Sequence, residues 1–299
     1  MTGPLAPRPI EHVPSVGVVV LSQGTRPREL GAALASALAQ TGVTVDAVVV
    51  GNGWTPANLP HGVRAVALPE NVGIPAGRNA GVAAVAGEFL FFLDDDESVP
   101  SPRFLSDVIA LMRRDPSIAL VQPRIVDPRG GTLPRRWVPR IRKGSPERPS
   151  AVFSVVEGAV VIPRAVFERA GRWAGEFFYA HEGIELAWRV WDQGLRAWYA
   201  GDLVAHHPAV AVTRHAEFYR LNARNRVWLA RRNLPLPLIP LYVGSWTAVQ
   251  LLRSARNRTG LRDWWGGWFA GWLQSPGERR PLRWRTVLRM TLAGRPPVI

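Results

Sequence analysis

The alternation of short apolar runs with helix-forming segments over residues 16–122 most constrains how this chain folds. Val16–Leu21 is a continuous β-branched run, which is typical of a strand buried on both faces. After it, Pro27 and Glu29 open a helix whose leucines recur at helical spacing. The other predicted strands are Asp46–Val50, Arg64–Leu68, Glu88–Leu93 and Ile118–Gln122, and the other predicted helices are Ile74–Ala86, Ser101–Arg114 (with Ser101 as N-cap) and Glu182–Trp191. This order predicts an α/β fold with a mostly parallel sheet flanked by helices.

Three consecutive aspartates, Asp94 to Asp96, directly follow the apolar strand Glu88–Leu93. In open α/β sheets the carboxyl ends of the strands form the edge where ligands bind. Clustered carboxylates repel one another and need a compensating cation, and oxygen ligands of this type select Mg²⁺ or Mn²⁺ together with substrate phosphates. The chain has no cysteine, so a metal must be held by oxygen or histidine. The pattern predicts a divalent cation site, with an acidic turn that caps the next helix as the structural alternative.

Four sequence blocks occur in an order that resembles glycosyltransferase family 2, including its rhamnosyl- and galactosyltransferase-like members. The blocks are Glu70–Gly81, the acidic triplet, Gly158-Ala159, and His181–Arg189 followed by Val204–His207. Together they cover residues 15–232 in register, and Gly158 belongs to the acceptor side of the pattern. The resemblance implies a GT-A fold that binds a nucleotide-sugar donor linked to UDP, dTDP or GDP.

The resemblance also implies a metal and diphosphate site. Asp94 and Asp96 match the two family carboxylates that bind the donor ribose and the metal that bridges its diphosphate, and Asp95 shares that site. His206 matches a late histidine that completes the metal or diphosphate site, and its neighbour His207 remains an alternative. The expected metal ligands are therefore Asp94, Asp96 and His206, and the expected cofactor is Mg²⁺ or Mn²⁺.

The donor nucleotide pocket follows the family pattern only in part. Arg78 and Asn79 match residues that line this pocket, and a guanidinium suits phosphate oxygens because it can donate two parallel hydrogen bonds. A surface ion pair is the structural alternative for Arg78. The family's base-reading aspartate is replaced by Gly51, so the resemblance leaves Asn52 as the candidate for the nucleobase contact.

The acceptor block also departs from the pattern, because Gly183 stands where many relatives have the aspartate that serves as base. We expect the adjacent Glu182 to be the base, with His181 in reserve and a raised pKa for Glu182. Glu185 and Arg189, both in the acceptor block, are one helical turn apart and can form an ion pair. We therefore expect Glu185 to have a structural role.

The C-terminal part of the chain differs in composition. The net charge is +14, and from Arg220 to Ile299 fifteen arginines stand against two acidic residues, together with seven of the thirteen tryptophans. This predicts a division into a catalytic domain, residues 1–213, and a helical, membrane-associating region, residues 214–299, that binds an anionic membrane surface. A solvated helix packed on the catalytic domain and a homodimer surface are alternatives. The proline-broken segment Leu234–Leu252 is expected not to cross a membrane, and Pro123–Pro149 to be a mobile basic loop.

These features predict a metal-dependent, inverting glycosyltransferase that transfers a sugar to a polysaccharide, glycolipid or lipid-linked acceptor. One alternative is a nucleotide-sugar-binding protein without turnover. A nucleic-acid-binding protein that uses the arginine-rich tail is a second, but no recognised nucleic-acid motif occurs, so no such partner is expected. The N-terminal residues lack an apolar signal segment, so the expected location is the cytoplasm, at the inner face of the cell membrane.

Overall fold

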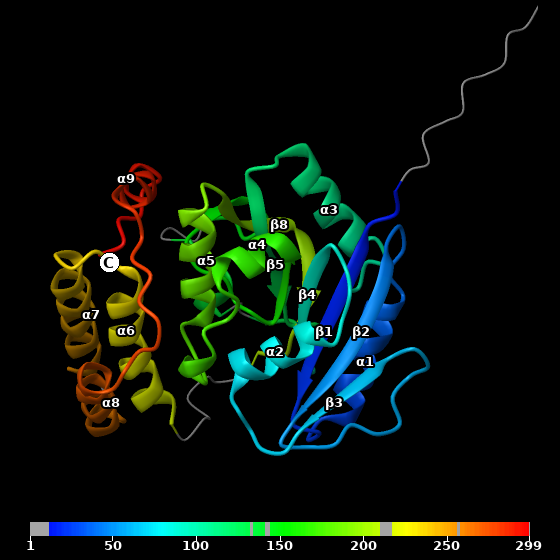
Figure 1. The fold of residues 1–299 in the computed structure, drawn as a ribbon, viewed down its shortest axis with the longest axis horizontal. Coiled ribbons are helices and arrows are strands. Elements are labelled where there is room, and N and C mark those ends of the chain that lie inside the picture. Colours follow the sequence, from blue (N-terminus) through cyan, green and yellow to red (C-terminus); the bar gives the residue numbers. More distant parts are fainter. Residues whose placement is uncertain (1–11, 132–133, 141–143, 210–216, 256–257, 299) are drawn as a thin grey trace, which may run out of the picture.

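A computed structural model describes residues 12–131, 134–140, 144–209, 217–255 and 258–298. Its core is a sheet of eight described strands in the order β3-β2-β1-β4-β7-β5-β8-β6 (Figure 1). The strands are β1 (Ser15–Ser22), β2 (Thr44–Asn52), β3 (Arg64–Leu68), β4 (Phe89–Asp94), β5 (Ile118–Val126), β6 (Ser150–Val152), β7 (Ala159–Pro163) and β8 (Arg196–His206). The predicted α/β class is confirmed.

Parallel pairing brings one end of several strands to a common edge. β1 pairs in parallel with β2 and with β4, and β5 pairs in parallel with β8, whereas β7 runs antiparallel between β4 and β5. In this register Leu21 lies between Val50 and Asp94. Because the carboxyl ends of β1, β2 and β4 meet there, the residues that follow these strands converge on one edge.

Helices cover both faces of the sheet. The helices are α1 (Pro27–Leu38), α2 (Ile74–Ala83), α3 (Phe104–Arg114), α4 (Arg164–Ala170), α5 (Glu182–Asp192), α6 (Phe218–Asn233), α7 (Leu238–Ser254), α8 (Leu261–Leu273) and α9 (Trp284–Leu292). α1 and α3 pack on one face, where Leu34 and Val108 meet β-strand valines, and α2, α4 and α5 pack on the other. Both faces of the strands are apolar, as the continuous runs predicted.

Two local predictions were wrong. α3 begins at Phe104 with Arg103 at its N-cap, while the Ser101 hydroxyl accepts the Arg103 N–H at 3.2 Å in the preceding turn. The segment Pro123–Pro149 is not wholly a loop, because β5 continues to Val126 and Trp137 is buried in a short 3₁₀ helix. Arg142, one of the arginines of this segment, lies outside the described residues.

The C-terminal helices α6 to α9 gather beyond α5 at one end of the molecule (Figure 1). Val227 and Trp228 of α6 share a hydrophobic cluster with the sheet-covering helices, so this region is continuous with the core. Gly267 and Gly271 of α8 face the α6 backbone and Val227 so closely that a Cβ would not fit at either position. Among the described residues no helix is both long and apolar enough to span a membrane. The expected boundary at residues 213 and 214 falls outside the described residues.

Candidate functional site

A cleft of about 840 Å³ opens at the carboxyl edge of the sheet. Its walls come from the loop after β1, the acidic loop after β4, the segment before β7, the start of α5 and one side of α6. It contains these residues predicted from the sequence: Asn52, Arg78, Asp94, Asp95, Asp96, Gly158, His181 and Glu182. The two-sided burial of β4 and the parallel register therefore bring residues that are far apart in sequence to one site.

Backbone hydrogen bonds fix the acidic loop after β4. The Asp94 N–H donates to the Gly158 carbonyl at 2.7 Å, and the Glu97 N–H donates back to the Asp94 carbonyl at 3.1 Å. Ser98 and His206 then exchange two hydrogen bonds of 3.0 and 2.7 Å. The loop is thus tied to β7 and to the end of β8, so its carboxylates are positioned before any ligand binds.

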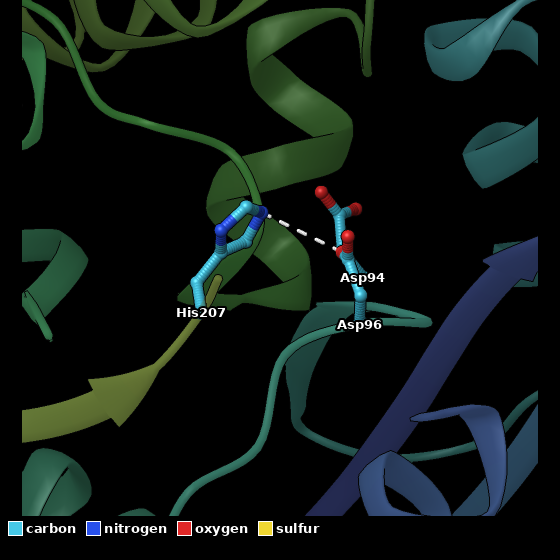
Figure 2. Close-up of side chains that lie close together, drawn as sticks. All are labelled: Asp94, Asp96 and His207. Carbon is cyan, nitrogen blue, oxygen red and sulfur yellow. Dashed lines mark ion pairs between the residues drawn. The ribbon is translucent and has the colours of Figure 1, made fainter. Parts of the chain in front are cut away.

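Asp94, Asp96 and His207 form a cluster that could hold a metal ion (Figure 2). One ligand atom from each lies within 4.8 Å of the others, and His207 Nε2 is 3.5 Å from Asp96 Oδ1. Burial lowers the pKa of His207, which favours a neutral imidazole with a free lone pair. Its Nδ1 is 2.6 Å from the Pro208 carbonyl oxygen, and a proton on Nδ1 leaves Nε2 as the ligand atom. Two carboxylates and an imidazole suit Mn²⁺.

The histidine predicted for this cluster, His206, is the wrong one of the pair. His206 is the last residue of β8 and uses its backbone to bond Ser98, while His207 carries its imidazole to the acidic loop. Neighbouring residues at a strand end point to opposite sides, so only one of the two can face the aspartates. The alternative that the sequence left open, His207, is the one the structure places there.

Arg26 is a member of the site that sequence reasoning missed. It precedes α1 and forms ion pairs with Asp95, at 2.9 Å, and with Asp96. Asp95 also accepts the Ser22 hydroxyl at 2.7 Å, and burial raises its pKa. Asp95 thus holds Arg26 and the end of β1 in place. Arg26 follows β1, the strand that pairs with β4, and this position is the sequence signal that could have pointed to it.

Arg78 lies at the floor of the cleft and is 2% exposed. Its Nη2 donates to Asp94 Oδ1 at 2.6 Å, whereas its Nη1 is buried without a hydrogen-bond partner in the described structure. Burial alone would lower the pKa of Arg78, but Asp94, Glu157 and Glu182 raise it overall, so the guanidinium stays charged. The ion pair considered as the alternative for Arg78 exists, with Asp94, but the guanidinium is buried rather than on the surface, and its Nη1 remains to bind an anion.

The predicted donor residues Asn52 and Asn79 use their amides within the protein. Asn52 is buried, donates to Asn71 Oδ1 at 2.8 Å and accepts the Val72 N–H at 2.9 Å. Asn79 bonds both backbone groups of Trp173, at 2.8 and 3.2 Å, and is not among the residues that line the cleft. These contacts hold the loops beside α2, and both donor assignments remain predictions.

The close packing around Gly51 explains in part why no aspartate stands at this position. A Cβ at this position would collide with the carbonyl oxygen of Trp54 and with the ring of Pro56. The turn after β2 therefore has no room for a side chain at Gly51.

Three glutamates line the cleft, of which Glu97 and Glu182 are buried and Glu157 is half-buried. Burial, followed by the charge of Glu157, raises the pKa of Glu182 to about 8. Burial also raises the pKa of Glu157, which accepts the Gly183 N–H at 2.7 Å. Both carboxylate oxygens of Glu97 are buried without a hydrogen-bond partner among the described residues. Of these three glutamates, only Glu182 was predicted from the sequence to belong to the site, although Glu157 directly precedes the motif glycine Gly158.

His181 precedes α5 with a left-handed backbone, at a φ of 76°. Neither of its ring nitrogens has a hydrogen-bond partner in the described part of the chain. Burial, and then the charge of Arg226, hold the pKa of His181 well below its usual value, so the imidazole is neutral. It faces the cleft next to Glu182.

Glu185 and Arg189, the other predicted acceptor-side residues, lie outside the cleft. The expected ion pair between them exists, at 3.4 Å, but Glu185 also accepts hydrogen bonds from Arg232 at 2.8 Å and Asn233 at 3.0 Å. These two partners belong to α6, so Glu185 connects α5 to the C-terminal helices.

Two residues of α6 fasten the segment that leads into α5. The Asn225 amide donates to the carbonyl oxygens of Phe177, Tyr179 and Ala180 at 2.9, 2.7 and 2.9 Å, and Arg224 adds a hydrogen bond to the Phe177 carbonyl. Within this segment, positive φ values occur at Phe178, Ala180 and His181. The position of His181 and Glu182 thus depends on the C-terminal helices.

The sheet, its flanking helices and the acidic loop define the GT-A class of α/β proteins. The model for "Glycosyl transferase family 2" matches residues 19–171, and the chain belongs to this family. The chain is 31% identical over 146 residues to the pre-mycofactocin glycosyltransferase of Mycobacterium tuberculosis, covering 46% of this chain and 31% of that protein. It therefore spans about a third of the length of this relative.

Solved structures with low sequence identity share the fold. The S. aureus TarS fragment 1–349 in complex with UDP-GlcNAc matches with a TM-score of 0.59 at 13% identity, over 92% of this chain and 83% of that one. The mannosyltransferase PcManGT from Pyrobaculum calidifontis in complex with GDP-Man and Mn²⁺ matches with a TM-score of 0.54 at 17% identity, over 95% and 85%. The predicted GT-A fold is confirmed.

Proposed function

We propose that this protein is a metal-dependent glycosyltransferase that moves a sugar from a nucleoside-diphosphate sugar to an acceptor hydroxyl with inversion. The observation that carries the proposal is the joining of Arg78 to Asp94 beside Asp96 and His207 in one cleft. A cation site next to a buried guanidinium with a free nitrogen suits a diphosphate. Family membership supports the same reaction class.

The cation is held by Asp94, Asp96 and His207. When bound, a divalent cation neutralises the charge that develops on the leaving diphosphate. Arg78 binds the same diphosphate through its free Nη1, and Asp95 keeps Arg26 beside the site. The solved relatives that carry UDP-GlcNAc, or GDP-Man with Mn²⁺, support a UDP-, dTDP- or GDP-linked donor and Mn²⁺ or Mg²⁺ as the cofactor.

The acceptor enters between α5 and α6. Phe218, Asn222 and Arg226 of α6 line this side of the cleft, and a carboxylate of the pair Glu157 and Glu182 removes the proton from the acceptor hydroxyl. Glu182 is buried and Glu157 is half-buried, so bulk water has limited access to this pair, which suits a base that must act on a bound hydroxyl. The acceptor class we propose is a glycan or a lipid-linked precursor.

The experiment that tests this function is a thermal-shift screen of UDP-, dTDP- and GDP-sugars, each with Mn²⁺, Mg²⁺ or EDTA. We expect one nucleotide to stabilise the protein only with metal, and Asp96→Asn to lose that shift. Asp107→Asn, which alters an exposed ion pair with Arg103, should keep it. A shift without release of nucleoside diphosphate over time would favour a binding protein without turnover, and no shift with any donor would refute the proposal.

We also propose that the C-terminal helices lie on an anionic membrane at its cytoplasmic face. Trp284, Leu288 and Leu292 of α9 recur every four residues and are all exposed, and Phe269 and Leu273 of α8 are exposed as well. Apolar side chains among arginines suit a membrane–water interface. Vesicle sedimentation should show binding that requires anionic lipid and is lost in Leu288→Ser/Leu292→Ser. Equal binding to neutral vesicles would contradict the proposal.

Several arginines of this region have partners within the protein. Arg231 donates to the carbonyl oxygens of Gly271, Trp272 and Gln274, and Arg279 and Arg232 also donate to backbone carbonyls. Such arginines stabilise the helical region, so it is the exposed apolar side chains of α8 and α9, which nucleic-acid binding would not use, that favour the membrane proposal.

A further inference from the structure

We propose that Glu157 is the general base of this chain, with its carboxylate in the space that a side chain at position 183 would occupy. This inference rests on the proposed sugar transfer and deepens it, because it identifies one member of the pair Glu157 and Glu182 as the group that accepts the proton.

Gly183 and Glu157 are complementary in shape. A Cβ built on Gly183 would lie well inside van der Waals contact of Glu157 Oε1 and of the Val155 carbonyl oxygen. The Gly183 N–H, at the start of α5, instead donates to Glu157 Oε1 at 2.7 Å. A side chain at 183 and the carboxylate of Glu157 are thus mutually exclusive in this backbone. The carboxylate that position 183 lacks is supplied by Glu157, from the segment before β7.

The other two glutamates fit the role less well. Both oxygens of Glu97 are buried without a hydrogen-bond partner among the described groups, and Glu97 fills the space beside Gly158, with Oε1 3.8 Å from His207 Nε2. Glu182 follows His181 and keeps Oε2 buried without a partner. Glu157 is fixed by a hydrogen bond from the Gly183 N–H, a group far from it in sequence, whereas the backbone hydrogen bond to Glu182 comes from its own N–H. The Glu157 carboxylate therefore has a defined place at the acceptor side.

The surrounding charges have different effects on the pKa values of Glu157 and Glu182. Arg78 and the Gly183 N–H favour the ionised form of Glu157, although burial raises its pKa. Glu182 has a pKa of about 8 because of its burial and the nearby Glu157. Two adjacent carboxyl groups that share a site do not ionise together, so the one with more donors ionises first. Glu157 is then the base, and Glu182 retains its proton near neutral pH.

In the proposed sugar transfer, each bond that forms is matched by a bond that breaks, and the proton has a defined acceptor. The acceptor oxygen forms a bond to the anomeric carbon, and the bond from that carbon to the diphosphate oxygen breaks with its electron pair on the phosphate. The proton of the acceptor hydroxyl passes to the Glu157 carboxylate. Because water can replace the acceptor, hydrolysis of the donor requires the same proton transfer and reports on it without knowledge of the acceptor.

The test uses the full-length protein and the nucleotide sugar found by thermal shift, with released nucleoside diphosphate as the readout. Glu157→Gln should lower kcat by about 10²–10⁴-fold, the usual range for loss of a general base, with donor affinity within about threefold of wild type. Glu182→Gln should lose less. Glu168→Gln, at an exposed pair with Arg172, is the matched control and should keep wild-type kcat.

A rescue variant separates a base from a structural group. Glu157→Ala removes one of the two groups that a Cβ at position 183 would meet, and the Val155 carbonyl, the other, must shift for Glu157→Ala/Gly183→Asp to place a carboxylate there again. The double variant should recover at least about tenfold in kcat over Glu157→Ala, in line with the range for a positioned base. If Glu157→Gln melts below the assay temperature, Glu157→Asp replaces it, and its kcat should fall while its melting temperature stays near that of wild type.

Three outcomes overturn the inference. They are a kcat for Glu157→Gln within about fivefold of wild type, a larger loss in Glu182→Gln than in Glu157→Gln, and no recovery in a folded double variant. In each case wild-type turnover still supports the proposed function. If wild-type protein neither binds nor hydrolyses any nucleotide sugar with metal, the proposed function and this inference fail together.

Discussion

Arg78 Nη2 and Asp94 Oδ1 lie 2.6 Å apart at the floor of the cleft, and the guanidinium is almost fully buried. The pair joins Arg78 to Asp94, a proposed metal ligand, so one contact positions both halves of the proposed diphosphate site. Asp94 is partly exposed, but Arg78 also faces Glu157 and Glu182, so removing the buried guanidinium leaves several carboxylates without its charge, which is more costly than the pair is stabilising.

Arg78→Met should therefore lower the free energy of unfolding by about 3–5 kcal/mol. The matched control is Arg64→Met, which breaks an exposed pair with Asp46 and should cost about 1 kcal/mol or less. Urea denaturation of both variants measures the difference. Equal losses in the two variants would show that the pair at Arg78 is solvated.

His207→Ala should weaken Mn²⁺ binding by at least about tenfold, because loss of even a supporting partner of a metal ligand costs about 10–100-fold. His206→Ala should bind Mn²⁺ as wild type does, since the side chain of His206 does not belong to the cluster. Isothermal titration with Mn²⁺ and UDP measures both affinities. The reverse order of losses would restore His206 as the ligand.

Glu182→Gln should stabilise the protein increasingly as the pH rises from about 4.5 to about 8. The folded-state pKa of Glu182 is about 8, above its ordinary value of 4.5, so the folded state holds a proton that the unfolded state has released in this window. Stability from this group is complete below pH 4.5 and is lost as the pH rises to 8. Glutamine mimics the protonated form and avoids that loss.

Melting temperatures of Glu182→Gln and wild type at pH 5 and pH 8.5 measure this effect. Glu278→Gln, at an exposed glutamate next to Arg280, is the matched surface control at both pH values. A constant difference for Glu182→Gln at both pH values would mean that Glu182 is ionised throughout.

Gly183→Ala should destabilise the protein by about 1–3 kcal/mol, the usual cost of adding a methyl group to a closely packed site. The new Cβ would collide with Glu157 Oε1. Gly31→Ala, in the exposed part of α1 with no atom near the new Cβ, should instead stabilise by about 1 kcal/mol through helix propensity. Thermal denaturation measures both changes, and a stabilising Gly183→Ala would show that Glu157 moves away at no cost.

Much of the fold could be predicted because local pattern and tertiary packing agree. Arg64–Leu68 forms β3 with the predicted bounds, and the run before Asp94 forms β4. The boundary of α3 was less predictable, because Ser101 bonds in a turn that precedes the helix. A side-chain oxygen near a helix start can serve either a cap or a turn, and the sequence alone does not distinguish the two.

The site could be predicted where its residues follow one strand, as Asp94 to Asp96 do. Arg26 and Glu157 were missed because they reach the cleft from other elements, through contacts that depend on strand order. The choice between His206 and His207 depended on which side of β8 faces the acidic loop. That choice follows from register and twist, which a pair of adjacent histidines does not reveal.

The three hydrogen bonds from the Asn225 amide have a consequence for engineering. A chain that ended after β8 would retain the aspartates but expose the carbonyls of Phe177, Tyr179 and Ala180. The left-handed residues among them cost about 1–3 kcal/mol each and persist only while their surroundings enforce them. Chimeras that exchange the tail with another glycosyltransferase should therefore carry residues 177–181 with it, or the graft will misplace the acceptor side of the cleft.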